Sequence, residues 1–91
     1  MERTVNSTAH EIGGNISYWI GLRGTNQHDL SIQAGIREET LSRIISGTQM
    51  PGTETLINIA RALRIPLSAL QPKELDQYGN ISVDFLQLKK G

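Results

Sequence analysis

The segment GIREETLSRIISG (residues 35–47) has the pattern of a short helix behind a tight turn. Apolar residues at positions 41, 44 and 45 recur at the three- and four-residue spacing that places them on one face of a helix. Gly35 opens the segment and Gly47 ends it, and glycine readily adopts the positive φ angles of such turns. We therefore expect a helix over residues 38–46. Its outer face would carry Arg37, Glu38, Glu39, Ser42 and Arg43.

The residues before this segment predict a second short helix, roughly over residues 27–34. Leu30 and Ala34 lie four residues apart on its inner face, and Ile36 follows the turn glycine. Small and apolar residues at such a corner allow the helix over residues 27–34 to stack steeply across the helix over residues 38–46. The outer face of the helix over residues 38–46 then stays free, which is the arrangement that a helix-turn-helix presents to the DNA major groove.

The flanking sequence predicts three more short helices. Ile16, Trp19 and Ile20 share one helical face, so we expect a first helix over residues 15–23 with Asn15 as its N-cap. The run TETLINIARALRI (residues 53–65) predicts a fourth helix, and PLSAL after it predicts a short fifth one. The expected fold is an all-α domain of five helices over residues 15–72.

The two ends of the chain differ from this helical part. Residues 1–14 are polar and end in two glycines, which predicts a flexible N-terminal arm. In the C-terminal tail, residues 73–91, the apolar side chains of Ile81, Val83 and Phe85 alternate with polar ones, which predicts a β-strand. A single strand needs a partner edge for its backbone groups. We expect the same strand of a second copy to provide it, so that these three residues form the dimer interface; the alternative is a disordered tail.

The whole pattern resembles the lambda-repressor/Cro-like, or Xre-type, helix-turn-helix family over about residues 15–71. The resemblance is carried by Gln27, Leu30, Gly35, Ile36, Leu41, Ile44, Gly47, Pro51, Leu56, Ile59, Ala60, Ala62, Leu63, Ile65 and Leu70. It implies an all-α domain that binds double-stranded DNA and works as a dimer on a palindromic operator.

The resemblance also assigns roles to individual residues, because in this family the third helix enters the major groove. The residues implied to read base edges are Arg37, Glu38, Glu39, Ser42 and Arg43. Those implied to contact the DNA backbone are Asn26, Gln27, Thr40, Thr48 and Gln49.

The sequence departs from the family pattern in three ways. Ser31 stands where alanine is common; it is small enough to fit, and its hydroxyl can bond a nearby carbonyl. Ile20 and Ile45 stand where many relatives pair an arginine with a glutamate, and we predict that the two isoleucines touch. Arg37 stands where relatives carry a small polar cap. Arginine cannot accept a hydrogen bond from backbone amides, and the two acids after it can partly replace the cap by stabilising the helix N-terminus.

Charge argues for weak binding to DNA in general. The chain has nine basic and nine acidic residues, and residues 26–52 hold two basic and three acidic ones, a net charge of −1. Glu38 and Glu39 therefore admit three interpretations: one accepts a hydrogen bond from cytosine, both only favour the helix start, or both repel DNA. Arg43 either reaches a guanine or pairs with Glu39 one turn away, and the free protein can use the ion pair.

The remaining sequence excludes several classes of protein. The chain has no cysteine, hence no disulfide scaffold or thiol nucleophile, and no supported catalytic triad. His10 and His28 have no second ligand at metal spacing, so we expect no metal. Because no catalytic triad is supported, we also expect no enzymatic activity, and we expect no cofactor. No signal peptide or membrane span is visible, and we expect a cytoplasmic protein. The hypothesis is a homodimeric transcriptional repressor of bacterial or phage type. The alternative is an antitoxin or other protein-interaction module, with a second protein such as a toxin as partner.

Overall fold

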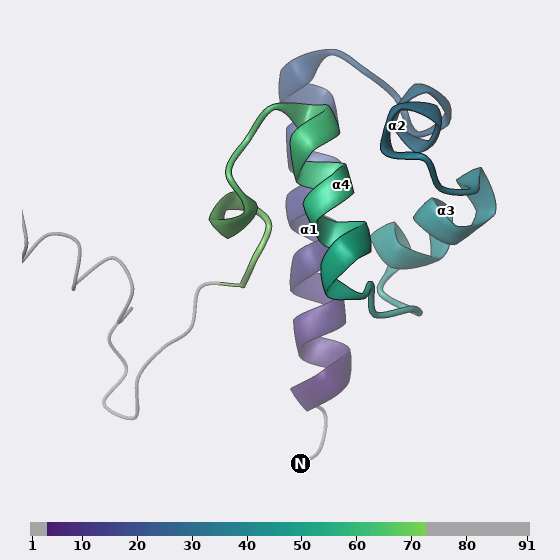
Figure 1. Ribbon diagram of the computed structural model, residues 1–91. Coiled ribbons are helices and arrows are strands. Elements are labelled where there is room, and N and C mark those ends of the chain that lie inside the picture. The colour runs from purple at the N-terminus through teal and green to yellow at the C-terminus, as the bar shows by residue number, and fades with distance from the viewer. Residues whose placement is uncertain (1–3, 73–91) are drawn as a thin grey trace, which may run out of the picture.

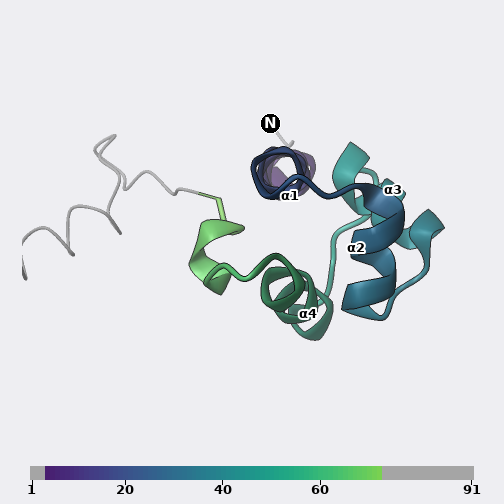
Figure 2. The same ribbon diagram turned by 90° about the horizontal axis from the view of Figure 1, so that it is seen from above.

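The computed structural model describes residues 4–72, and within this range the chain is all-α. The elements are α1 (Thr4–Arg23), α2 (Gln27–Ala34), α3 (Glu38–Ser46), α4 (Thr53–Leu63) and η1 (Leu67–Ala69), a single turn of 3-10 helix. The long helix α1 packs on α3, while α2 packs on both α3 and α4 (Figure 1). Seen from above, the pair α2–α3 lies on one side of the molecule and η1 on the other (Figure 2).

One apolar core lies between these helices. Its largest fully buried side chains are Ile16, Leu30, Leu41, Ile44, Ile59, Leu63 and Leu70. Each described element except η1 contributes to this set, and Leu70 follows directly after η1. The apolar spacing of the sequence therefore indicated the inner faces of α2, α3 and α4 correctly.

The first helix begins earlier than the sequence predicted. The flexible arm over residues 1–14 is wrong for residues 4–14, because α1 starts at Thr4. Ala9, Ile12 and Ile16 follow one another at spacings of three and four residues, and all three are buried. Gly13 lies among them without acting as a hinge: a Cβ there would collide with the backbone carbonyl of Ile45 on α3. The glycine lets the two helices approach closely.

Asn15 is consequently not an N-cap but a residue in the middle of α1. Its side-chain amide donates a hydrogen bond to the carbonyl oxygen of Leu70 at 3.0 Å. The predicted fifth helix is only the 3-10 turn η1, with Pro66 as its N-cap residue. Pro72 disfavours helical backbone at Gln71, which limits any extension of this turn. Asn15 therefore fastens the end of this short turn to α1.

The end of α4 is held by a side chain from α1. Arg64 caps this helix in the left-handed conformation, with φ 61°. Arg23 donates from Nε to the carbonyl oxygen of Leu63 at 2.9 Å and from Nη2 to that of Arg64 at 3.2 Å. A cation at the C-terminal carbonyls also suits the helix dipole.

Two further predictions concern strands and membranes. The tail strand, with Ile81, Val83 and Phe85, lies outside the described residues, so that strand and its dimer contact stay predictions. Between residues 4 and 72, no helix combines the length and the apolar character that crossing a membrane requires.

Candidate nucleic-acid interface

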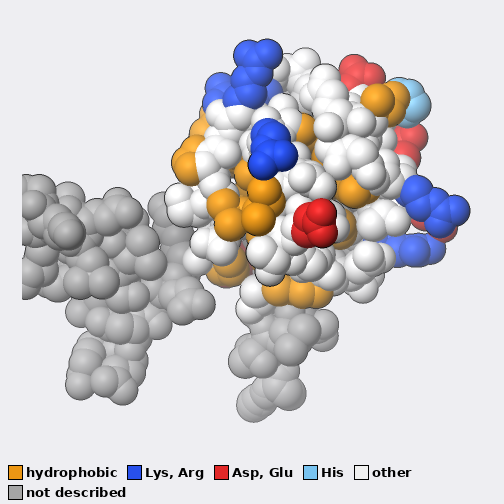
Figure 3. Space-filling view, in the orientation of Figure 1, with side chains coloured by type: hydrophobic (Ala, Val, Ile, Leu, Met, Phe, Trp, Pro, Cys, Tyr) orange, Lys and Arg blue, Asp and Glu red, His pale blue; other side chains and the backbone are white. Residues whose placement is uncertain are grey.

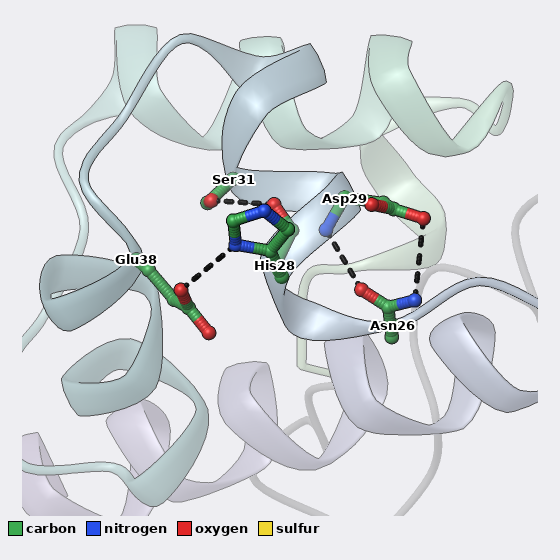
Figure 4. A network of polar contacts seen from close by, with 5 residues as sticks. All are labelled: Asn26, His28, Asp29, Ser31 and Glu38. Carbon is green, nitrogen blue, oxygen red and sulfur yellow. Dashed lines mark hydrogen bonds and ion pairs between the residues drawn. The ribbon is translucent and has the colours of Figure 1, made fainter.

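Helix α2 begins at a side-chain cap. The N-cap is Asn26, whose Oδ1 accepts a hydrogen bond from the backbone N–H of Asp29 at 2.8 Å. Its amide nitrogen donates to the Asp29 carboxylate at 3.2 Å (Figure 4). These two bonds fix the entry of the helix and orient the exposed first turn, where Gln27 is also exposed. Contact of Asn26 and Gln27 with a DNA backbone stays a prediction.

The turn between α2 and α3 depends on a glycine. Gly35 has φ 73°, and nothing lies within 4 Å of the position where a Cβ would stand, so the requirement is conformational rather than steric. The N–H of Gly35 bonds the carbonyl of Ile32 at 3.1 Å, and that of Ile36 bonds the carbonyl of Ser31 at 3.0 Å. This pair of bonds is the Schellman arrangement, which satisfies the last carbonyls of α2.

Ser31 has the role that the sequence suggested. Its side chain is buried, and its hydroxyl donates a 2.7 Å hydrogen bond to the carbonyl oxygen of His28 (Figure 4). A serine is therefore accommodated in the packed corner without an unsatisfied polar group.

Helix α3 has an inner and an outer face, as predicted. Leu41 and Ile44 are completely buried. Exposed side chains cover the opposite face, namely those of Arg37, Glu38, Glu39, Ser42 and Arg43, while Thr40 is half-buried. Figure 3 shows basic, acidic and histidine side chains gathered at the edge that α2 and α3 form. The division into faces is confirmed; the base contacts stay predictions.

The start of α3 lacks a side-chain cap. Arg37 is the N-cap residue, in extended conformation with φ −74° and ψ 144°, and its side chain makes no capping bond. Glu38 and Glu39 occupy the first turn, where negative charge is favourable by about 0.3–1 kcal/mol per residue. This agrees with the prediction made for the position of Arg37.

Both acids at the front of α3 have a basic partner. Arg43 donates from Nη2 to Oε2 of Glu39 at 2.7 Å, an ion pair between residues four apart on the helix. Nδ1 of His28 on α2 lies 3.0 Å from Oε1 of Glu38 (Figure 4). All four side chains are exposed, and the pair within α3 stabilises the helix by about 0.2–0.5 kcal/mol.

Glu38 changes the acid–base behaviour of His28. The hydrogen bond from the imidazole to Glu38 and the charge of this carboxylate raise the pKa of His28 above its ordinary 6.5, with a smaller contribution from Asp29. Sequence reasoning missed the pair because the two residues are ten positions apart and meet only across the turn. The sequence did contain one signal for this pair: His28 is in the first turn of one predicted helix, and Glu38 is at the start of the next.

The loop after α3 is held against the end of that helix. The carbonyl oxygen of Arg43 accepts hydrogen bonds from the backbone N–H of Thr48 at 3.0 Å and that of Gln49 at 3.3 Å. It also accepts from the hydroxyl groups of Ser46, at 3.0 Å, and Thr48, at 3.2 Å. Thr48 and Gln49 are thus placed at the C-terminal end of α3, and their predicted contact with DNA is not tested by this geometry.

The predicted contact between Ile20 and Ile45 also stays a prediction. Both side chains are half-buried and pack against the core. The α1 residue that lies directly under the backbone of Ile45 is Gly13.

Comparisons with known proteins point to one architecture. A family model described as helix-turn-helix matches residues 17–70. Among solved structures, the chain is similar to the restriction-modification controller protein C.AhdI from Aeromonas hydrophila, with a TM-score of 0.67 and 18% sequence identity. The alignment covers 68% of this chain and 94% of that one, and at this identity the likeness shows the fold alone. No curated protein matches the chain.

Proposed function

The chain belongs to the Xre-type, lambda-repressor-like helix-turn-helix family of DNA-binding transcription regulators, and from this premise we propose that it is a dimeric repressor of bacterial or phage type. Its binding site would be a palindromic operator in double-stranded DNA. The observation that carries the proposal is the outer face of α3, where five exposed side chains lie over an inner face anchored by Leu41 and Ile44. Members of this family typically are not enzymes.

In the proposed complex, α3 enters the major groove and Arg43 reads a base. A bidentate contact between an arginine and guanine contributes about 1–3 kcal/mol of discrimination. The exposed pair of Arg43 with Glu39 contributes only about 0.2–0.5 kcal/mol, so a correct base can displace it. Arg37, Glu38, Glu39 and Ser42 would contact neighbouring base edges from the same face.

Backbone contacts would set the position of α3 in the groove. Asn26 and Gln27 stand at the N-terminus of α2, where free backbone amides favour a phosphate. Thr40, Thr48 and Gln49 would contact phosphates from α3 and the loop after it. Because residues 26–52 carry a net charge of −1 in the unprotonated state of His28, general attraction to DNA is weak and affinity depends on specific contacts.

Dimerisation would supply the rest of the affinity. Two α3 helices would lie one turn of DNA apart, about 34 Å, on a pseudo-palindromic site. We propose that the tail strands of two copies pair through Ile81, Val83 and Phe85. Deletion of residues 79–91, followed by measurement of the molecular mass in solution, tests this interface. A monomer is expected, and an unchanged dimer eliminates the tail as the interface.

Selection from random duplex DNA, followed by gel-shift titration, tests the function itself. An enriched inverted repeat is expected, and the absence of any specific site would refute the proposal. Arg43→Ala should relax specificity at one base, whereas an equal loss across all sequences would make Arg43 a phosphate contact. Arg61→Ala is the matched control, because Arg61 is an exposed arginine on α4, outside the proposed interface.

A protein-interaction module, for example an antitoxin, is the second candidate. It is favoured by Tyr18 and Leu22, which lie one turn apart on α1 with 63% and 57% of their surface exposed. Exposed apolar residues of this kind can mark a protein-binding surface. A chain that selects no DNA but forms a stoichiometric complex with the product of an adjacent gene would favour this candidate.

A further inference from the structure

His28 and Glu38 join the two helices of the helix-turn-helix at the front of α3. The imidazole comes from the first turn of α2, and the carboxylate from the first residue of α3 (Figure 4). Their atoms Nδ1 and Oε1 are 3.0 Å apart, which is hydrogen-bonding distance. Since Nδ1 must carry the hydrogen in this bond, Nε2 stays available to bind the second proton.

The charge of the candidate interface depends on that second proton. Residues 26–52 contain Arg37 and Arg43 as cations and Asp29, Glu38 and Glu39 as anions, so two positive and three negative charges leave −1. One proton on the histidine of this region brings the sum to zero. Protonation of His28 therefore removes the net negative charge of this region, a charge that weakens its attraction to DNA phosphates.

We propose that His28 is a positioning residue for the reading helix: its protonated form holds and neutralises Glu38, and thereby couples DNA binding to the uptake of one proton. This inference rests on the proposed function, because it concerns how the same surface meets DNA. It assigns His28 a role that the helix-turn-helix pattern does not give it.

The coupling follows from where the proton is stabilised. In the free protein Glu38 already raises the pKa of His28 above 6.5. Phosphates near the front of α3 would stabilise the imidazolium further, so the pKa of His28 in the complex lies above that in the free protein. The affinity for DNA is then highest below the pKa of His28 in the free protein, and it decreases as the pH rises through the pKa of His28 in the complex. This decrease occurs above pH 6.5.

The other charged groups around His28 do not replace this effect. Asp29, on the same helix, raises the pKa of His28 less than Glu38 does. On α3, Glu39 is paired with Arg43. Helix α4, which packs against α2, carries Glu54 and Arg61. Neither of these two residues is among the groups that shift the pKa of His28.

The test measures the Kd for the selected operator by fluorescence anisotropy at constant ionic strength, from about pH 6 to about pH 9. The wild type should lose affinity as the pH rises, by at most about tenfold per pH unit because one proton is exchanged. His28→Gln keeps a hydrogen-bond donor but cannot titrate, and its Kd should be nearly constant. His10→Gln is the matched control: the His10 ring lies beside Gly47 at the C-terminal end of α3, whereas Glu38 is at the N-terminal end, so this variant should keep the wild-type dependence.

A second measurement does not require DNA. NMR titration of the His28 ring should show a lower pKa in Glu38→Gln than in the wild type, since Glu38 is the main cause of the raised value. An unchanged pKa would overturn the inference, because the pair would then be absent in solution.

The outcomes separate this inference from the proposed function. If no DNA is selected at any pH, the proposed function fails and the inference fails with it. If operator binding is retained and His28→Gln shows the same pH dependence as the wild type, the inference alone fails.

Discussion

The two adjacent glycines of α1 predict opposite effects of the same substitution. A Cβ on Gly13 would collide with the backbone carbonyls of Ile44 and Ile45, whereas nothing lies within 4 Å of a Cβ on Gly14. Alanine is favoured over glycine inside a helix by about 0.8–1.0 kcal/mol. We therefore expect Gly14→Ala to stabilise the fold by about that amount.

Gly13→Ala gains the same helix propensity but forces α1 away from α3. The obstacle is backbone, which cannot turn aside as a flexible side chain can, and overpacking of this kind costs about 1–3 kcal/mol. Because the propensity term is common to both variants, the difference between their free energies of unfolding isolates this cost. We expect Gly13→Ala to be less stable than Gly14→Ala by about 1–3 kcal/mol.

Urea denaturation followed by circular dichroism measures both free energies of unfolding. Thermal unfolding provides a second measurement, since about 1 kcal/mol shifts the Tm of a domain of this size by roughly 4–8 °C. Equal effects of the two substitutions, or no effect of either, would refute the close packing of α1 on α3. A flexible arm over residues 1–14 predicts no effect, so the experiment also tests the early start of α1.

Three further predictions concern the local contacts of α2 and its turn. Asn26→Ala removes the N-cap of α2 and should lower the free energy of unfolding in urea by about 1 kcal/mol. Gly35→Ala should lower it by about 1–2 kcal/mol, because φ 73° is unfavourable for alanine although space is available. The raised pKa of His28 stabilises the folded chain below pH 6.5, and this stability is lost as the pH rises through the folded-state pKa. The urea midpoint of the wild type, measured relative to His28→Gln, should therefore decrease over that interval, and an increase would contradict the ion pair with Glu38.

The sequence predicted α2 and α3 well because their signals are local. Gly35 ends α2 in the left-handed conformation, Gly47 does the same for α3, and the apolar spacing between them allows one helical register. Such features act over a few residues and are visible in a single sequence. The bounds of both helices, and the division of α3 into two faces, follow from them.

The start of α1 could not be predicted in the same way, because its decisive contact is tertiary. Gly13 and Gly14 lower the helix propensity of the segment, and read locally they indicate flexibility. One of them is required by the close backbone of α3, some thirty residues later in the chain. Asn15 is similar: as a local signal it resembles a cap, while its bond reaches Leu70. A partner this distant leaves no periodic trace in the sequence.

The candidate interface shows the same division between local and tertiary information. The pair of Glu39 with Arg43 could be anticipated from helical spacing, but that of His28 with Glu38 depends on the angle between α2 and α3. The two pairs then differ in what DNA binding would require of them. Arg43 must leave Glu39 to reach a base, whereas His28 can remain on Glu38 and supply positive charge in place. The acids at the front of α3 are thus compatible with the proposed reading helix, in which Glu39 would release its cation to DNA and Glu38 would retain its own.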